Sequence, residues 1–123
     1  MLKEGLDYST ERIVEKSNLA VTMGSGDLQV LATPALVAAM ENAAMLAVAD
    51  ALEPTDTTVG GHIDMKHLRP TPLGEKFTAY AKVVRVEGKK IEYSLIAEDG
   101  KGVIGEGTHT RFVVNREKFM SRL

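Results

Sequence analysis

The sequence predicts an α+β fold in which one antiparallel sheet curls around a single long helix, and three observations support this. Residues 33–52 are helix-forming and almost entirely apolar, so the helix should be buried all round. The residues after it alternate between apolar and polar positions, as half-buried strands do. Gly88 and the Asp99-Gly100 pair interrupt that alternation at hairpin turns, which makes the neighbouring strands antiparallel.

The predicted helix at residues 33–52 has a start signal and a stop signal. The hydroxyl of Thr33 is expected to cap the N-terminus by accepting a backbone N–H. Pro34 suits the first helical position, where its missing N–H costs nothing. Pro54 cannot continue the helix. Since one short chain must cover this helix, a surrounding sheet is the simplest solution.

Glu41 is the one charge that interrupts the apolar surface of this helix before its last residues. An isolated buried charge is very costly. The carboxylate is therefore either a tolerated group at a crevice or subunit contact, or a functional group. Asn42 beside it adds an amide that can donate and accept hydrogen bonds.

About five strands are expected around the helix. Residues 9–20 are predicted to form the first, with Ile13 and Val14 turned inward, and residues 21–27 a glycine-containing loop that is either a connector or a lid over the helix N-terminus. Later strands are expected at residues 57–69, 76–86, 90–98 and 103–114, with residues 115–123 as a polar tail. In the last strand, the inward set contains either Ile104 and Phe112 or His109 and Val113, and the pattern leaves both open.

Alternation along residues 57–69 predicts which histidine faces the helix. Val59, Gly61, Ile63, Met65 and His67 share the more apolar face, so His67 should point inward and His62 outward. A single inward histidine is more often a core residue than a catalytic one. The pair Gly60 and Gly61 weakens a strand and often marks a bulge or the close approach of a ligand.

Composition limits the classes of function. The 123 residues suit a single domain at residues 1–123. A formal charge of -2, scattered Lys and Arg, and the lack of Trp argue against nucleic acid as a partner. The lack of cysteine excludes disulfides, thiolate metal sites and a Cys nucleophile, and fits a cytoplasmic protein. The N-terminus has no apolar signal region, and the helix is too short and too charged to span a membrane.

A resemblance to a known family covers nearly the whole chain and rests on four segments. They are VLATPALVAAMEN, VGGHIDMKHLRPTPLG, RVEGKKIEYSLIAEDG and IGEGTHTRFVVNREKF. Together they resemble hotdog-fold thioesterases similar to fluoroacetyl-CoA thioesterase. In that family a Thr, a Glu and a His form the catalytic set, and these fall on Thr33, Glu41 and His67. A Gly on the His strand lines the family's site, and Gly60 matches its spacing.

The resemblance implies hydrolysis of an acyl-CoA thioester to a free acid and CoA, with no metal and no redox cofactor. Glu41 would act as nucleophile or base, His67 as general acid or base, and Thr33 as donor or nucleophile at the carbonyl. Gly60, Gly61 and Asn42 are the expected substrate-binding residues. The family's fluoroacetyl-specific enzyme has a Phe-rich lid before the helix, and residues 21–33 contain no Phe. A general short-chain acyl-CoA is therefore the expected substrate.

The spacing of the expected catalytic set indicates a second subunit. Thr33 and Glu41 lie eight residues apart, which is about 12 Å of axial rise along a helix. One member of the set should come from a partner chain, or Glu41 should act through His67. A homodimer or higher homo-oligomer, without nucleic acid or membrane, is therefore expected. The alternatives are a non-hydrolytic acyl-CoA binding or sensing module and, with no signature for it, a hotdog hydratase or dehydratase.

Overall fold

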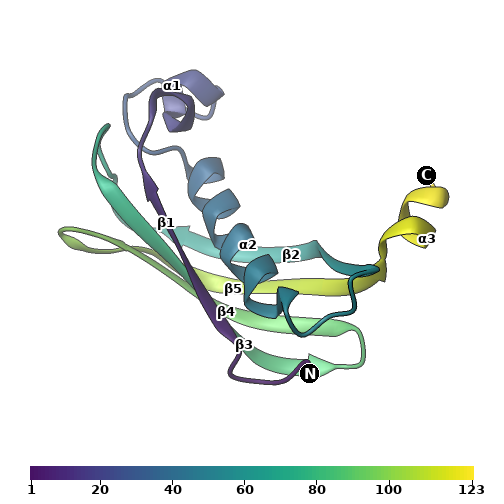
Figure 1. Cartoon of the computed structure of the whole chain (residues 1–123). Helices are drawn as coiled ribbons and strands as arrows, with labels where there is room; N and C mark the ends of the chain where they lie inside the picture. Colours follow the sequence, from purple (N-terminus) through teal and green to yellow (C-terminus); the bar gives the residue numbers. More distant parts are fainter.

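A computed structural model describes all 123 residues and contains one five-stranded antiparallel sheet curved around the long helix α2 (Figure 1). The strand order across the sheet is β1-β3-β4-β5-β2. This arrangement confirms the predicted α+β architecture. The strands are β1 (Asp7–Ile13), β2 (Asp56–His67), β3 (Lys76–Glu87), β4 (Lys90–Asp99) and β5 (Gly102–Asn115).

The segment before the long helix differs from the prediction. Strand β1 ends at Ile13, and the chain continues as a 3-10 helix (Lys16–Asn18) and a short helix α1 (Ala20–Met23). The Asn18 side chain accepts a hydrogen bond from the backbone N–H of Glu15 at 3.0 Å, which turns the chain out of the strand. Val14 is buried as expected, whereas Ile13 is exposed, because successive strand residues point to opposite faces.

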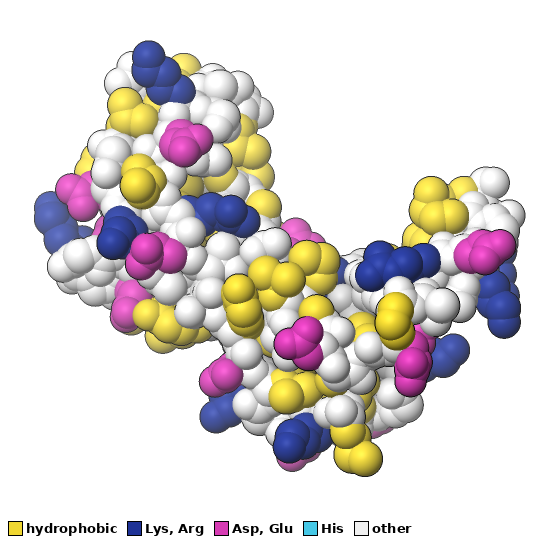
Figure 2. Space-filling model, viewed as in Figure 1, with side chains coloured by type: hydrophobic (Ala, Val, Ile, Leu, Met, Phe, Trp, Pro, Cys, Tyr) yellow, Lys and Arg dark blue, Asp and Glu magenta, His cyan; other side chains and the backbone are white.

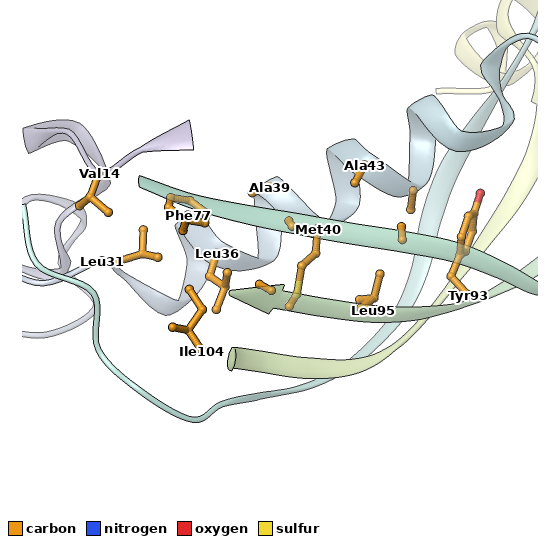
Figure 3. Close-up of a cluster of buried hydrophobic side chains, with 14 of the residues drawn as sticks. Val14, Leu31, Leu36, Ala39, Met40, Ala43, Phe77, Tyr93, Leu95 and Ile104 are labelled. Carbon is orange, nitrogen blue, oxygen red and sulfur yellow. The ribbon is translucent and has the colours of Figure 1, made fainter. Parts of the chain in front are cut away.

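Helix α2 (Thr33–Ala49) packs one face on the sheet. Three of its buried residues are alanines, which lets the helix approach the strands closely, and Figure 3 shows Leu36 and Met40 on the side of the helix that faces the strands. The buried residues are Leu36, Ala39, Met40, Ala43, Ala44 and Val48. Burying each large member contributes about 1.5–3 kcal/mol.

The expectation that α2 is buried all round is wrong for the single chain. Ala38 and Ala49 are exposed, and Met45 and Leu46 are half-buried. Hydrophobic side chains gather in the middle of the face shown in Figure 2, where α2 crosses the sheet. One sheet covers only one side of a helix, so the other apolar side has no cover within the chain. No helix of the structure has both the length and the apolar character that crossing a membrane requires.

The ends of the chain's helices also depart from the prediction. Ala32 occupies the N-cap position of α2, and Thr33 is its first helical residue. The Thr33 hydroxyl is thus free for another partner. The helix ends at Ala49, three residues before the predicted end. The predicted polar tail contains a further helix, α3 (Arg116–Ser121), which stands away from the rest of the fold (Figure 1).

Strand β2 forms one edge of the sheet and contains a bulge. Gly60 pairs with Arg111 and His62 with the preceding residue of β5, which leaves Gly61 as the extra residue. The bulge reverses the alternation: a Cβ on Gly60 would meet Glu41 of the helix, and a Cβ on Gly61 would meet Phe112 on the opposite face. The predicted facing of the two glycines is therefore wrong, and of the two alternatives for this pair, a bulge or the close approach of a ligand, the bulge is present.

Strand β5 follows neither of the two predicted inward sets along its whole length. Ile104 is buried near its start, whereas His109 and Arg111 are buried further along. The pairing of β4 with β5 shifts between Ala97 and Glu98, close to the start of β5. An even-numbered residue is therefore buried at this shift and odd-numbered residues are buried after it.

Candidate active site

Thr33 and His67 meet where the start of α2 lies beside the end of β2. Their Oγ1 and Nδ1 atoms are 2.7 Å apart. The other ring nitrogen, Nε2, is buried and has no hydrogen-bond partner. Burial lowers the pKa of His67 from its ordinary value, and the nearby backbone of Arg69 raises it only in part. A neutral imidazole with one free nitrogen is equipped to accept a proton at neutral pH.

A pocket of about 270 Å³ lies beside this pair and is small for a ligand site. Residues of the loop between α1 and α2 form one wall, which agrees with the lid interpretation of this segment. The lining residues are Ala20, Ser25, Val30, Leu31, Thr33, His67, Leu68, Arg69 and Pro70.

The Glu41 carboxylate belongs to a second cluster, around the bulge in β2. Its Oε2 lies 4.0 Å from Nη1 of Arg111. A Cβ built on Gly60 would lie 3.0 Å from the same oxygen. The Glu41 side chain is 41% exposed, so this carboxylate lies at a crevice. It is reachable by solvent or by a ligand.

Buried polar side chains surround Arg111. Its Nε donates to Thr58 Oγ1 at 2.7 Å, and its Nη1 lies 3.2 Å from Nε2 of His109. Burial lowers the pKa of Arg111, but a guanidinium stays protonated in proteins. The sequence reasoning missed Arg111 and Thr58. The available signal was the position of Arg111 two residues after His109, which puts both on one strand face.

Tyr93 lies against this cluster at one end of the core (Figure 3). Its ring stacks on His109 with the centroids 5.9 Å apart. Its hydroxyl is buried and has no hydrogen-bond partner, and burial raises the pKa of Tyr93 to about 12. The phenol therefore stays neutral at physiological pH.

The structure does not bring all the predicted site residues together in one chain. Gly60, beside Glu41, pairs with Arg111, whereas His67 pairs with Gly105. Six residues of β5 separate these two pairs, which is about 20 Å along a strand. The Thr33–His67 pair and the Glu41 cluster are thus two separate clusters within one chain.

Two other predicted residues lie outside both clusters. Asn42 accepts a hydrogen bond from the Thr10 hydroxyl at 2.9 Å, which ties α2 to β1. Gly61 faces Phe112 on the opposite face of the sheet. No group of three His, Cys, Asp or Glu side chains is arranged to hold a metal ion.

The half-buried His67 and the buried His109 predict how stability depends on pH. Burial also lowers the pKa of His109. At pH values between the lowered histidine pKa values of the folded chain and about 6.5, the unfolded chain binds more protons than the folded chain. Stability should therefore fall as the pH drops from 7.5 to 5.5. Thermal melts across this range measure the change, and His67→Ala should flatten it. A melting temperature independent of pH would contradict the prediction.

Comparison with known proteins adds independent findings. A protein-family model described as fluoroacetyl-CoA-specific thioesterase matches residues 14–117 of this chain. The fluoroacetyl-CoA thioesterase of Streptantibioticus cattleyicolor is 38% identical over 95 residues, which are 77% of this chain and 68% of that protein. A solved structure of the fluoroacetyl-CoA thioesterase FlK has a TM-score of 0.92 at 30% identity, covering 99% of this chain and 95% of that one. A hot-dog-like protein from Thermanaerovibrio acidaminovorans has a TM-score of 0.88 at 24% identity, covering 98% and 90%.

Proposed function

This chain belongs to the fluoroacetyl-CoA-specific thioesterase family and hydrolyses acyl-CoA thioesters, and from that premise we propose that Thr33, Glu41 and His67 are its catalytic residues. The observation that carries the proposal is the 2.7 Å contact between Thr33 and His67 at the mouth of a small pocket. The resemblance of the sequence to the family assigns the same three positions.

The proposed site is shared between two subunits of a homodimer. Strand β2 is a sheet edge, and residues 60–64 in its middle are exposed. A free edge of this kind pairs readily with a second strand. Antiparallel pairing with a second copy, centred on Asp64, would set Gly60 opposite the partner subunit's His67, because the bulged pair Gly60 and Gly61 counts as one position of the ladder. Glu41 of one chain would then face the Thr33–His67 pair of the other.

The geometry of the Thr33–His67 pair suggests how each group acts. When Nδ1–H of His67 donates to Thr33 Oγ1, the Thr33 hydroxyl can donate to the thioester oxygen as negative charge develops there. If Glu41 attacks the carbonyl carbon, the C–S bond breaks with release of the thiolate, and the free Nε2 takes a proton from the water that then hydrolyses the anhydride and passes this proton to the thiolate. If Glu41 instead acts as the base, it takes the proton of the attacking water, and the free Nε2 relays this proton to the departing sulfur. In both cases one water is consumed, the C–S bond breaks, and the acid and CoA thiol are released.

The substrate proposal is a short-chain acyl-CoA without fluorine selectivity. The pocket is small, and residues 21–33 provide no Phe to line it. A cytoplasmic location is also part of the proposal, since a cysteine-free composition agrees with it.

The proposal predicts that fluoroacetyl-CoA is not strongly preferred over acetyl-CoA. The expected ratio of kcat/KM for the two substrates is below about 10. A pocket without Phe side chains can distinguish the two acyl groups only by a small difference in apolar contact. Thiol release measured on both substrates, with propionyl-CoA and butyryl-CoA as length controls, gives the ratio. A preference of several hundredfold for the fluorinated substrate would refute this substrate proposal.

The function proposal itself is tested by comparing two histidines on the same strand. His67→Ala should lower kcat for acyl-CoA hydrolysis by about 10²–10⁴, the usual effect of removing an acid–base group. His62→Ala is the matched control, because the His62 side chain is exposed, and should stay near wild type. Loss of activity in His62→Ala with retention in His67→Ala would reverse the assignment.

A further inference from the structure

Helix α3 carries apolar side chains that the rest of the chain leaves exposed. It follows β5 directly and extends from the sheet as an arm, with hydrophobic side chains near its end (Figure 2). Phe119 is 37% exposed, Met120 63%, and Leu123, just beyond the helix, 87%. Residues three and four apart share one face of a helix, so these side chains form an apolar stripe. A helix this short is stable only when it packs on another surface.

The start of α3 is fixed beside the free edge of the sheet. Asn115, the last residue of β5, pairs with Asp56 at the start of β2. The backbone N–H of Arg116 donates to the backbone oxygen of Thr55 at 2.9 Å, and its Nε donates to that of Pro54 at 3.2 Å. These hydrogen bonds set the direction in which α3 leaves the sheet. The apolar stripe is therefore held close to the edge strand β2.

A second group of exposed apolar side chains lies near the other end of β2, around the small pocket. The loop between α1 and α2 is joined there to the turn after β2. Val30 and Pro72 form an isolated β-bridge, and the backbone N–H of Leu31 donates to the backbone oxygen of Thr71 at 2.8 Å. The exposed hydrophobic residues of α1 and this turn, together with one from the loop, are Val21, Met23, Leu28, Leu68 and Leu73. We call these five residues the lid patch. Apolar side chains grouped in this way are typical of a surface that another molecule covers.

The proposed pairing of two β2 edges brings α3 of one chain to the lid patch of the other. Counted from Asp64, with the bulge as one position, Asp56 is level with the partner subunit's Thr71. Neighbouring strands are about 4.8 Å apart, so Asn115 lies two strand spacings, or about 10 Å, from that residue. Helix α3 has six residues and is about 9 Å long, which is enough to reach the lid patch.

The side of the sheet on which these elements lie also agrees. Helix α3 rises from the sheet in the same direction as α1 (Figure 1). The two-fold axis of an antiparallel strand pair is perpendicular to the sheet, so it keeps α1 of the second copy on that same side. The arm of one chain and the lid patch of its partner would therefore meet above one end of the paired strands.

The charges of the two segments are opposite. Residues 116–122 contain three basic side chains and one acidic one, Glu117. Residues 21–30 contain a single charged side chain, Asp27. Complementary charges add specificity to an apolar contact. A second copy of the chain thus supplies both the apolar stripe and the charge that the lid patch lacks.

We propose that α3 of each chain docks on the lid patch of a second copy, so that Phe119 and Met120 cover the outer side of the loop that walls the partner's pocket. The inference rests on the proposed function in that it assumes the dimer formed through β2. Each pocket then has its loop held in place by the other chain, which excludes water from the site.

Cysteine cross-linking tests the contact, because the chain has no cysteine of its own. Chains with Leu28→Cys and chains with Met120→Cys, differently tagged, are co-expressed, purified through both tags and treated with a short bismaleimide. Both replaced side chains are exposed, so folding should be unaffected. A covalent heterodimer on a denaturing gel is expected. Dimers by mass that do not cross-link would overturn the docking of α3 alone, and a monomeric mass would overturn it together with the shared site.

Val84→Cys paired with Met120→Cys is the matched control. Val84 is an exposed residue of β3, and β4 and β5 separate that strand from the β2 edge. No cross-link is expected. An equal yield of covalent heterodimer in this control would overturn the proposal, because the reagent would then be reporting random encounters.

Amide hydrogen exchange tests the same contact without added cysteines. In Phe119→Ser, exchange across residues 20–31 should become about 10-fold faster, the scale of a lost aromatic contact in an interface. Val84→Ser should leave these rates unchanged. Unchanged exchange in Phe119→Ser would contradict the docking of α3. If the wild type releases no thiol from any acyl-CoA, the proposed function fails, and the cross-link still decides whether α3 docks on the partner.

Discussion

Co-expression of two inactive variants, His67→Ala and Glu41→Gln, is expected to yield mixed dimers with restored activity. If each site combines the Thr33–His67 pair of one chain with Glu41 of the other, a mixed dimer contains one intact site and one site with both changes. With random pairing, half of the dimers are mixed, so the preparation should show about a quarter of the wild-type rate. Differently tagged chains, purified through both tags, should reach about half.

The control for this experiment pairs His67→Ala with Thr33→Ala. Both changes affect the same half-site, so no mixed dimer contains an intact one and activity should stay at the level of the single variants. Restoration in this control would point to exchange with wild-type chains. No restoration with Glu41→Gln, in dimers confirmed by mass, would show that each site lies within one chain.

Glu41→Gln is expected to remove activity without removing stability. The amide keeps the shape of the side chain but loses the charge, so kcat should fall by about 10²–10⁴. The melting temperature should change little, because the Glu41 side chain is 41% exposed and its ion pair with Arg111 is long. Thiol release and a thermal melt on the same preparation measure both quantities.

Glu53→Gln is a matched control for the charge change, since Glu53 is exposed after the end of α2. It should leave both the rate and the melting temperature unchanged. If Glu41→Gln keeps the wild-type rate and lowers the melting temperature, the carboxylate is structural and its catalytic assignment is wrong.

Much of the fold is predictable because its signals are local. The apolar run after Thr33 specifies the helix, and glycine turns specify the hairpins of β3, β4 and β5. Ile13 was wrongly expected to point inward because Ile13 and Val14 look equally apolar, and only the packed sheet decides which one points inward. The open face of α2 was also missed, since an apolar helix sequence does not reveal how much of it one chain can cover.

The site was predictable where strand alternation holds and unpredictable where it breaks. His67 lies beyond the bulge and faces the helix, as the alternation of strand residues predicts. Gly60 lies before the bulge, and the extra residue Gly61 reverses its facing. Arg111 was missed because a buried arginine is rare, and only the three-dimensional fold brings it beneath Glu41.

The loop that walls the small pocket folds back on itself as a separate unit. The backbone N–H of Ala20 donates to Val30 at 2.8 Å and that of Val21 to Leu28 at 3.1 Å. Ser25 within this closure is exposed and lines the pocket, so it can be replaced without disturbing the core. Thr33 and His67 lie on other elements. If this pocket receives the acyl group as proposed, substitutions in this loop alone can change the substrate range between related proteins while the hydrolytic chemistry is inherited unchanged.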